Sequence, residues 1–168
     1  MKTILITGAS SSIGRPLAQH LLKHGFTVLA HFRNCHDDLL TLKAKYEELL
    51  YLMPADFEDN VDLNNLIKNL ASFPPLFAII HLPSQKISLK PLARIQWTEY
   101  ETHMNIQLRS LQKIVQATIT SMKKSGSGYV ISISTDAIFG NNIPKGLTPY
   151  AVAKSALRGF MKSLDAEY

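Results

Sequence analysis

The sequence predicts an α/β protein whose parallel sheet is doubly wound, in three layers, with helices on both faces. Apolar runs of strand length alternate with helical patterns along all 168 residues. Turn and stop residues, such as Gly25 and the pair Pro74-Pro75, separate these segments. No repeat, low-complexity tract or linker interrupts the alternation. We therefore expect a single domain over residues 1–168.

Five apolar runs predict the strands, because parallel strands are covered on both faces and are apolar throughout. They are residues 2–7, 26–32, 52–55, 77–82 and 129–134. Five segments predict helices from their spacing of apolar residues, namely 13–24, 39–50, 61–73, 98–124 and 149–167. Ligands of such sheets bind at the carboxyl ends of the strands. The residues that follow each strand are therefore the candidate site.

The composition limits which class of protein this is and which ligands it can bind. Hydrophobic residues make up 46% of the chain and charged residues 18%, which favours a folded domain with a sizeable core. The net charge of +5 favours anionic ligands, but Lys and Arg are scattered and no basic helix or aromatic platform predicts nucleic-acid binding. The one cysteine, Cys35, has no partner for an intrachain disulfide, and no His/Cys cluster indicates a metal. No segment has the length of a signal peptide or a membrane span, so we expect a cytoplasmic protein without a membrane partner.

The first strand leads into the stretch Thr7-Gly8-Ala9-Ser10-Ser11-Ser12-Ile13-Gly14. Gly8 permits a tight turn, and Gly14 permits close packing of the helix on the strand. The stretch lies where a pyrophosphate meets the N–H groups of a helix N-terminus. It matches neither the P-loop nor the strict GxGxxG pattern. A tight strand-to-helix turn without a ligand is the alternative.

A second motif, YxxxK, begins the last predicted helix at Tyr150 and Lys154. Positions i and i+4 lie on one helical face, one turn apart. A free tyrosine has a pKa near 10, and a lysine cation one turn away favours its phenolate. This pairing suits a tyrosine that exchanges a proton with a substrate.

The order of these motifs closely resembles the short-chain dehydrogenase/reductase family over essentially the whole chain. The loop is similar to the family's TGxxxGxG loop, with Ser12 at the middle glycine, and the helix from Tyr150 is similar to its active-site helix. The resemblance implies an NAD(P)-binding Rossmann fold and hydride transfer between nicotinamide and a carbonyl or alcohol. It implies cofactor contacts from Gly8, Ser10, Ser11, Ser12, Ile13 and Gly14.

The resemblance also implies the catalytic residues. Tyr150 is the proton donor in reduction, and Lys154 supports it and holds the nicotinamide ribose. Thr135 or its neighbour Ser134 follows the fifth strand and holds the substrate oxygen, with Thr135 favoured. Asn105 kinks the long helix and anchors a water of the proton relay.

Residues after the second, third and fourth strands complete the predicted cofactor site. Arg33, followed by Asn34, ends the second strand without a preceding carboxylate, which favours NADP(H) over NAD(H) because a guanidinium suits the 2′-phosphate. The resemblance implies that Asp56-Phe57 contacts the adenine, although a helix cap is an alternative for Asp56. His81-Leu82 stands where one branch of the family has NNAG, and resembles the HLAA of the sugar-nucleotide branch instead.

The resemblance leaves three readings of the function. The first is an NADP(H)-dependent oxidoreductase acting on a small carbonyl or alcohol substrate. The second is a non-catalytic or fragmentary nucleotide-binding protein of the same fold, and the third is a sugar-nucleotide enzyme. Family members normally continue beyond the helix that ends near Glu167, so we expect a C-terminally truncated chain. The helix that starts near Thr98 and the last helix are where relatives assemble, which predicts a homodimer or homotetramer.

Overall fold

The computed structural model describes residues 2–34, 37–126, 128–139 and 143–168, so Cys35 lies outside the described residues. The chain folds into two compact units. The first unit comprises residues 1–82 and 113–132, and the second comprises residues 83–112 and 133–168. The expectation of a single domain over the chain stays a prediction.

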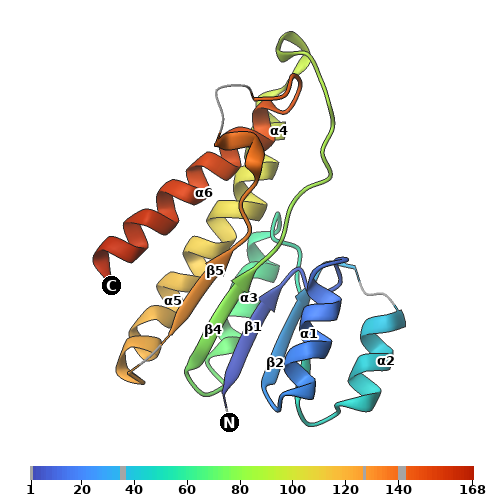
Figure 1. Ribbon diagram of the computed structural model, residues 1–168, viewed down its shortest axis with the longest axis vertical. Helices are drawn as coiled ribbons and strands as arrows, with labels where there is room; N and C mark the ends of the chain where they lie inside the picture. Colours follow the sequence, from blue (N-terminus) through green and yellow to red (C-terminus); the bar gives the residue numbers. More distant parts are fainter. Residues whose placement is uncertain (1, 35–36, 127, 140–142) are drawn as a thin grey trace. The chain divides into compact units, whose positions relative to one another are not determined.

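The first unit is built on one five-stranded parallel sheet with the order β3-β2-β1-β4-β5 (Figure 1). Its strands are β1 (Thr3–Thr7), β2 (Thr27–Phe32), β3 (Leu50–Pro54), β4 (Leu76–His81) and β5 (Tyr129–Ser132). The chain builds outward from β1 to β3 and then returns to the other side of β1, so β1 and β4 flank the topological switch point. The predicted doubly wound parallel sheet is confirmed.

The last row of this sheet brings two histidines to the sides of one threonine. Thr7 at the end of β1 pairs with His31 of β2 and with His81 of β4. His31 in turn pairs with Met53 of β3, and His81 with Ser132 of β5. Both imidazoles therefore lie at the carboxyl edge, where a ligand of this fold binds.

Buried aliphatic side chains hold the helices of the first unit to the sheet. The core cluster joins strand residues such as Ile6, Val28 and Ile80 to residues of helices α1 (Gly14–Lys23) and α2 (Asp37–Lys45). The helix residues in this cluster are Ala18, Leu22, Leu39 and Leu42. Full burial of a leucine or isoleucine side chain contributes about 1.5–3 kcal/mol, so this cluster accounts for much of the unit's stability.

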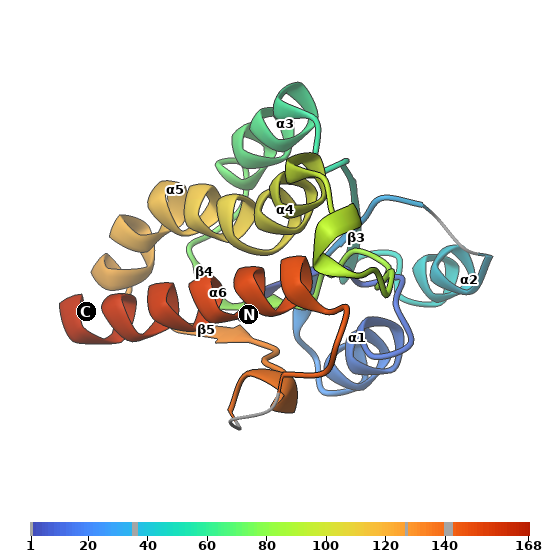
Figure 2. The same ribbon diagram turned by 90° about the horizontal axis from the view of Figure 1, so that it is seen from above.

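The opposite face of the sheet is covered by α3 (Asn60–Leu70) and by the part of α5 (Ser110–Lys124) that belongs to this unit, as Figure 2 shows. Helix α3 begins at Asp59, whose carboxylate accepts hydrogen bonds from the N–H groups of Val61 and Asp62. Such a cap satisfies donors that have no partner within the helix. Helices on both faces give the expected three layers.

The second unit is mainly helical. It contains the 3₁₀ turns η1 (Leu92–Arg94) and η3 (Asp136–Ile138), the helix α4 (Trp97–Met104), a π-helical turn η2 (Asn105–Arg109) and the helix α6 (Thr148–Glu167). Gln96 and Glu99 form a capping box at the start of α4. Pro149 stands in the first turn of α6, where its missing N–H costs no helical hydrogen bond.

Two predicted helices were wrong in extent. The helix expected over 39–50 ends at Lys45, because Leu50 is buried and pairs with Val28 as the first residue of β3. The helix expected over 98–124 is divided by the π turn η2. The strand expected over 129–134 ends at Ser132.

Candidate functional site

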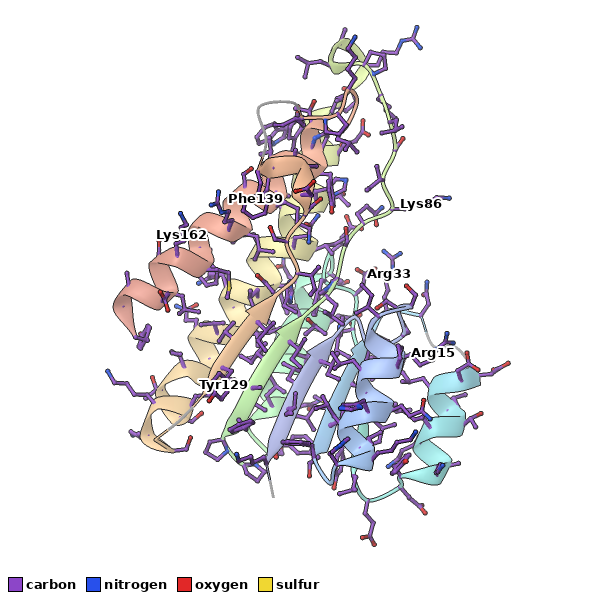
Figure 3. The ribbon with its side chains drawn as sticks, in the orientation of Figure 1. Arg15, Arg33, Lys86, Tyr129, Phe139 and Lys162 are labelled. Carbon is purple, nitrogen blue, oxygen red and sulfur yellow. The ribbon has the colours of Figure 1, made fainter. Side chains whose placement is uncertain are left out.

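The predicted site residues fall into two groups. The candidates for cofactor binding from Gly8 to Leu82 lie in the first unit, whereas Tyr150 and Lys154, which are candidates for both cofactor binding and catalysis, lie in the second with the other catalytic candidates. Within the first unit, Figure 3 places Arg33 beyond the carboxyl end of β2 and Arg15 at the start of α1.

The loop between β1 and α1 is shaped by its two glycines. Gly8 has a φ of 75°, a conformation that favours glycine. A Cβ on Gly14 would lie 2.4 Å from the carbonyl oxygen of Gly8, so no larger residue fits there without movement of the backbone. The Ser11 hydroxyl accepts a hydrogen bond from the Gly14 N–H over 3.0 Å. The loop is therefore folded tightly onto the first turn of α1.

The remaining loop residues lie on its outer side. Ser12 and Ile13 are exposed, and Ser10 is half-buried. Ser12 occupies the place of the middle glycine, yet its φ is not positive. A serine is thus accommodated here without a positive φ, and its side chain is exposed.

His31, which the sequence analysis did not select, contacts this loop directly. Its Nδ1 accepts a hydrogen bond from the Gly8 N–H over 3.1 Å, and its backbone carbonyl accepts one from the Ala9 N–H over 2.7 Å. Its Nε2 lies 3.0 Å from the carbonyl oxygen of Ala55, and its ring stacks on Phe57 with centroids 3.9 Å apart. Burial lowers the pKa of His31 to about 4, so the imidazole is neutral near pH 7.

His81 and Leu82 join β4 to the end of β1. The Nδ1 of His81 lies 2.7 Å from the hydroxyl of Thr7, and the His81 side chain is only 1% exposed. The N–H of Leu82 donates to the carbonyl of Thr7 over 3.1 Å. The imidazole of His81 is therefore engaged within the sheet, and any contact of this segment with a ligand falls to its backbone.

Arg33 and Asn34 follow β2 and are exposed. The guanidinium of Arg33 lies 4.0 Å from the carboxylate of Glu58, and 48% of the Arg33 side chain is accessible. A pair so long and exposed is weak, so the guanidinium keeps most of its capacity for an anion.

Asp56 and Phe57 follow β3 with different roles. The carboxylate of Asp56 accepts from the Glu58 N–H over 2.9 Å, and its own N–H donates to Asp62 over 2.9 Å. Asp56 thus shapes the turn, while the cap of α3 is Asp59. Phe57 is buried against His31.

Tyr150 and Lys154 lie together in the second unit, one turn apart on α6. The Nζ of Lys154 lies 5.8 Å from the centre of the Tyr150 ring and donates a hydrogen bond to the carbonyl of Ile133 over 2.7 Å. Lys154 is only 5% exposed, and burial lowers the pKa of its ammonium. The ammonium is therefore held in one position beside the tyrosine ring.

Thr135 and Ser134 follow Ile133 in the same unit. The hydroxyl of Thr135 accepts from the Ala137 N–H over 3.4 Å and so caps the short turn η3. Thr135 is half-buried, whereas Ser134 is exposed. Both hydroxyls thus remain candidates for the substrate contact.

Asn105 begins the π-helical turn η2, between α4 and α5. A π turn widens the helix and is frequent at functional sites. The family resemblance implied a kink of the helix at this asparagine, and the structure has a π turn that begins there, while the role of Asn105 stays a prediction.

A cavity of about 200 Å³ in the second unit is lined by Tyr150 and by polar side chains of α4 and of the segment after β4. His103, another residue that the sequence analysis did not select, lies in its wall, 6.1 Å from the Tyr150 ring between centroids. The Nδ1 of His103 lies 3.1 Å from the amide nitrogen of Gln107. Tyr150 thus lies in the wall of a small cavity that is lined mainly by polar side chains.

A doubly wound sheet with a glycine loop at its switch point, together with a Tyr-x-x-x-Lys pair whose lysine is buried, is typical of a class of dinucleotide-dependent enzymes. The family model described as short chain dehydrogenase matches residues 2–168. The chain belongs to the short-chain dehydrogenase family. It is 26% identical over 167 residues to an uncharacterized oxidoreductase of Staphylococcus aureus (strain MW2), covering 99% of this chain and 71% of that relative.

Solved structures share the same fold. The closed form of a serine dehydrogenase complexed with NADP+ superimposes with a TM-score of 0.84 at 21% identity, covering 98% of this chain and 66% of that chain. An NADH-dependent reductase complexed with NAD gives a TM-score of 0.85 at 23% identity, covering 99% of this chain and 72% of that chain. Among the residues that the structure describes, no helix has the length and apolar character needed to cross a membrane.

Proposed function

We propose that the chain is an NADP(H)-dependent oxidoreductase that interconverts a carbonyl and an alcohol on a small-molecule substrate. In this proposal Tyr150, Lys154, Thr135 and Asn105 act at the substrate. The loop from Gly8 to Gly14 and the residues after β2, β3 and β4 hold the cofactor. When bound, the nicotinamide supplies the hydride for reduction and accepts it in oxidation.

The loop has the properties that a pyrophosphate requires. Its turn at Gly8 has a positive φ, and Gly14 is packed so closely on Gly8 that the first turn of α1 abuts the loop. A helix N-terminus presents N–H groups and a partial positive charge to an anion. The residues present thus fit a dinucleotide, although the Cβ of Ser12 narrows the approach compared with the glycine that the family has there.

The preference for NADP(H) rests on Arg33. Its exposed guanidinium follows β2, and the nearest carboxylate described for it is Glu58, in a weak pair 4.0 Å long. A planar donor fork suits a phosphate better than a ribose hydroxyl. Solved relatives of this fold are described with NADP+ and with NAD, so the fold accommodates either cofactor.

At the substrate, the Tyr150 hydroxyl donates a proton to the carbonyl oxygen during reduction and takes one back during oxidation. The Lys154 ammonium favours the phenolate form of Tyr150 after that transfer, because a nearby cation stabilises an anion. The hydroxyl of Thr135 donates to the same substrate oxygen. Asn105 holds a water that returns the proton to Tyr150.

The observation that carries the proposal is the position of Lys154. Its side chain is buried beside the Tyr150 ring and is held by the Ile133 carbonyl, at a cost in desolvation that lowers its pKa. Burial of an ammonium costs free energy that one hydrogen bond to a carbonyl offsets only in part, so a buried lysine beside a tyrosine is a candidate for a functional role. Support of a proton-donating tyrosine is such a role.

The Tyr150→Phe variant tests the assignment of the proton donor. We expect the turnover of a carbonyl substrate with NADPH to fall by about 10²–10⁴-fold, because general acid catalysis contributes that much. The affinity for NADPH, measured by nicotinamide fluorescence, should stay within about twofold, because the ring remains. Full activity in this variant would show that Tyr150 is not the proton donor.

A titration with NADPH and then NADH tests whether the chain binds a dinucleotide and whether it prefers NADP(H). Tight binding of NADPH with weak binding of NADH supports Arg33 as the reader of the 2′-phosphate. Equal binding of both removes the preference. Binding of neither to the folded chain contradicts the proposed function and favours the non-catalytic reading.

A further inference from the structure

His31 is the residue that connects the glycine loop to the rest of the carboxyl edge of the sheet. One side of its ring accepts the Gly8 N–H, and the other side faces the Ala55 carbonyl. The same residue's backbone carbonyl accepts the Ala9 N–H. The first two amides of the loop are therefore both held by one residue of the neighbouring strand.

These contacts fix the tautomer of the imidazole. A backbone N–H only donates, so Nδ1 carries no proton, and a backbone carbonyl only accepts, so Nε2 carries the proton. The ring is 3% exposed and lies nearly parallel to the Phe57 ring, at an interplanar angle of 2°. Its rotation is blocked by this packing. His31 is thus a rigid, neutral acceptor aimed at Gly8.

The groups around His31 keep it in this state. Asp56, after β3, is the charged group that acts on it, and its effect is smaller than that of burial. On β4, the ring of His81 lies beyond Phe57, and the centroids of the His81 and Phe57 rings are 6.4 Å apart. On β1, Thr7 pairs with His31 in the sheet register and separates it from His81.

The amide of Gly8 has a partner in a fixed position on the neighbouring strand. The turn at φ 75° directs its N–H toward β2, and Nδ1 receives it there. Glycine has wide conformational freedom, so an acceptor in a fixed position selects one of its conformations. The loop is then formed before any ligand arrives, which saves the ordering entropy that binding would otherwise cost.

We propose that His31 is a positioning residue for dinucleotide binding, which holds the glycine loop in its binding conformation through the Gly8 amide. The inference rests on the proposed function, because it assumes that the loop binds the pyrophosphate. It extends that function by naming a residue outside the loop that sets the affinity.

Two polar substitutions separate this role from simple structural support. In His31→Asn, the side-chain oxygen stands where Nδ1 stood and can still accept the Gly8 N–H. In His31→Gln, the longer side chain reaches toward Ala55 in place of Nε2 and removes the acceptor for Gly8. Both variants lose the ring stack on Phe57, so a purely structural role predicts similar losses in both.

We expect His31→Asn to bind NADPH within about threefold of the wild type, and His31→Gln to bind it about fivefold to tenfold more weakly, since one hydrogen bond is lost. The affinity for 2′-AMP, which has no pyrophosphate, should be the same in all three proteins. Measurements are made well below the melting temperature of each variant. Equal losses in both variants, or a parallel loss for 2′-AMP, would overturn the proposal.

Hydrogen exchange at the Gly8 amide gives a readout that needs no ligand. We expect slow exchange in the wild type and in His31→Asn, and faster exchange in His31→Gln, by at least about fivefold. Unchanged exchange in His31→Gln would overturn the proposal even if the affinities differ. If the wild type binds no dinucleotide, the proposed function fails and the link to affinity falls with it, while the exchange still decides whether His31 holds the loop.

Discussion

His31 illustrates at the scale of one residue how burial decides the charge of a side chain. Its pKa is lowered to about 4 in the folded chain, whereas an unperturbed histidine titrates near 6.5. Between these values the unfolded chain takes up a proton that the folded chain does not. Stability therefore falls as the pH falls from 6.5 to 4, and is regained as the pH rises, by at most about 3 kcal/mol.

The His31→Asn variant should remove this pH dependence. Asparagine does not titrate, so the wild type loses stability on acidification that the variant keeps. We expect the difference in unfolding free energy between the two proteins to shrink by about 2–3 kcal/mol from pH 7 to pH 4.5. Urea denaturation at both pH values measures it, and an unchanged difference would mean that folding does not lower the pKa of His31.

Arg33 and Glu58 make a second prediction for single residues. Replacing Arg33 with Met should lower the affinity for NADPH by about tenfold or more, because charge-assisted hydrogen bonds to a phosphate contribute about 1.5–3 kcal/mol. Glu58→Gln removes the carboxylate that competes for Arg33, and should raise the affinity for NADPH by about twofold to fivefold. NADH affinity, measured by the same fluorescence titration, serves as the control. A matching change for NADH in either variant would show that Arg33 does not read the 2′-phosphate.

The turn from β1 into α1 is the element on which cofactor binding depends most. Its geometry rests on Gly14, where a Cβ would meet the Gly8 carbonyl at 2.4 Å and the Ala9 Cα at 2.7 Å. Ser12, two residues earlier, is exposed and has an ordinary backbone conformation. Although both positions belong to one motif, close packing excludes a Cβ at position 14 and does not exclude one at position 12.

Gly14→Ala and Ser12→Gly form a matched pair. We expect Gly14→Ala to destabilise the fold by about 2 kcal/mol or more, because overpacking forces backbone shifts. We also expect a strong loss of affinity for NADPH in this variant. Ser12→Gly should change stability by less than about 1 kcal/mol and bind NADPH as tightly as the wild type or more so, since a Cβ is removed. Thermal unfolding and NADPH titration measure both effects. A tolerated Gly14→Ala would contradict the close packing of loop and helix.

The elements themselves could largely be predicted from local patterns. Buried apolar runs predicted all five strands, and helical spacing predicted α1, α3 and α6 within a few residues. The end of α2 was missed because Tyr46 and Leu49 continue its apolar spacing, while pairing with β2 decides where β3 begins. The contacts of His31 and His103 were missed for a similar reason, since they depend on strand register and on helix packing that no local pattern contains. The order of the motifs was enough to predict the family.

At the scale of the whole molecule, the sequence predicts assembly into a homo-oligomer. The predicted homo-oligomer uses the helix that begins near Thr98, whose residues the structure divides between the two units, and the last helix, which lies in the second unit. On α6, Val152 is 44% exposed, and its neighbours on that side, Ser155 and Gly159, are small and exposed. Such a face suits close packing against a second copy.

Light scattering after size-exclusion chromatography tests this assembly. We expect a mass of at least twice the 18.8 kDa of one chain, and a shift toward one chain in Val152→Glu, because a buried unpaired charge disrupts an interface. Val61→Glu on α3 introduces the same change at another exposed valine and should leave the mass unaltered. A single-chain mass for the wild type, or equal effects of both variants, would exclude assembly through α6.

The π turn at Asn105–Arg109 has a consequence for how this sequence tolerates change in length. A π turn contains one residue more than the α-helical turn it replaces, so it acts as an insertion that the helix has absorbed. Deletion of one residue within it would return the segment to α geometry and leave the apolar faces of α4 and α5 in place. A deletion within Ser110–Lys124 would instead rotate all later side chains by about 100° and bury polar groups. Alignments of this helix should therefore place their gaps at the π turn.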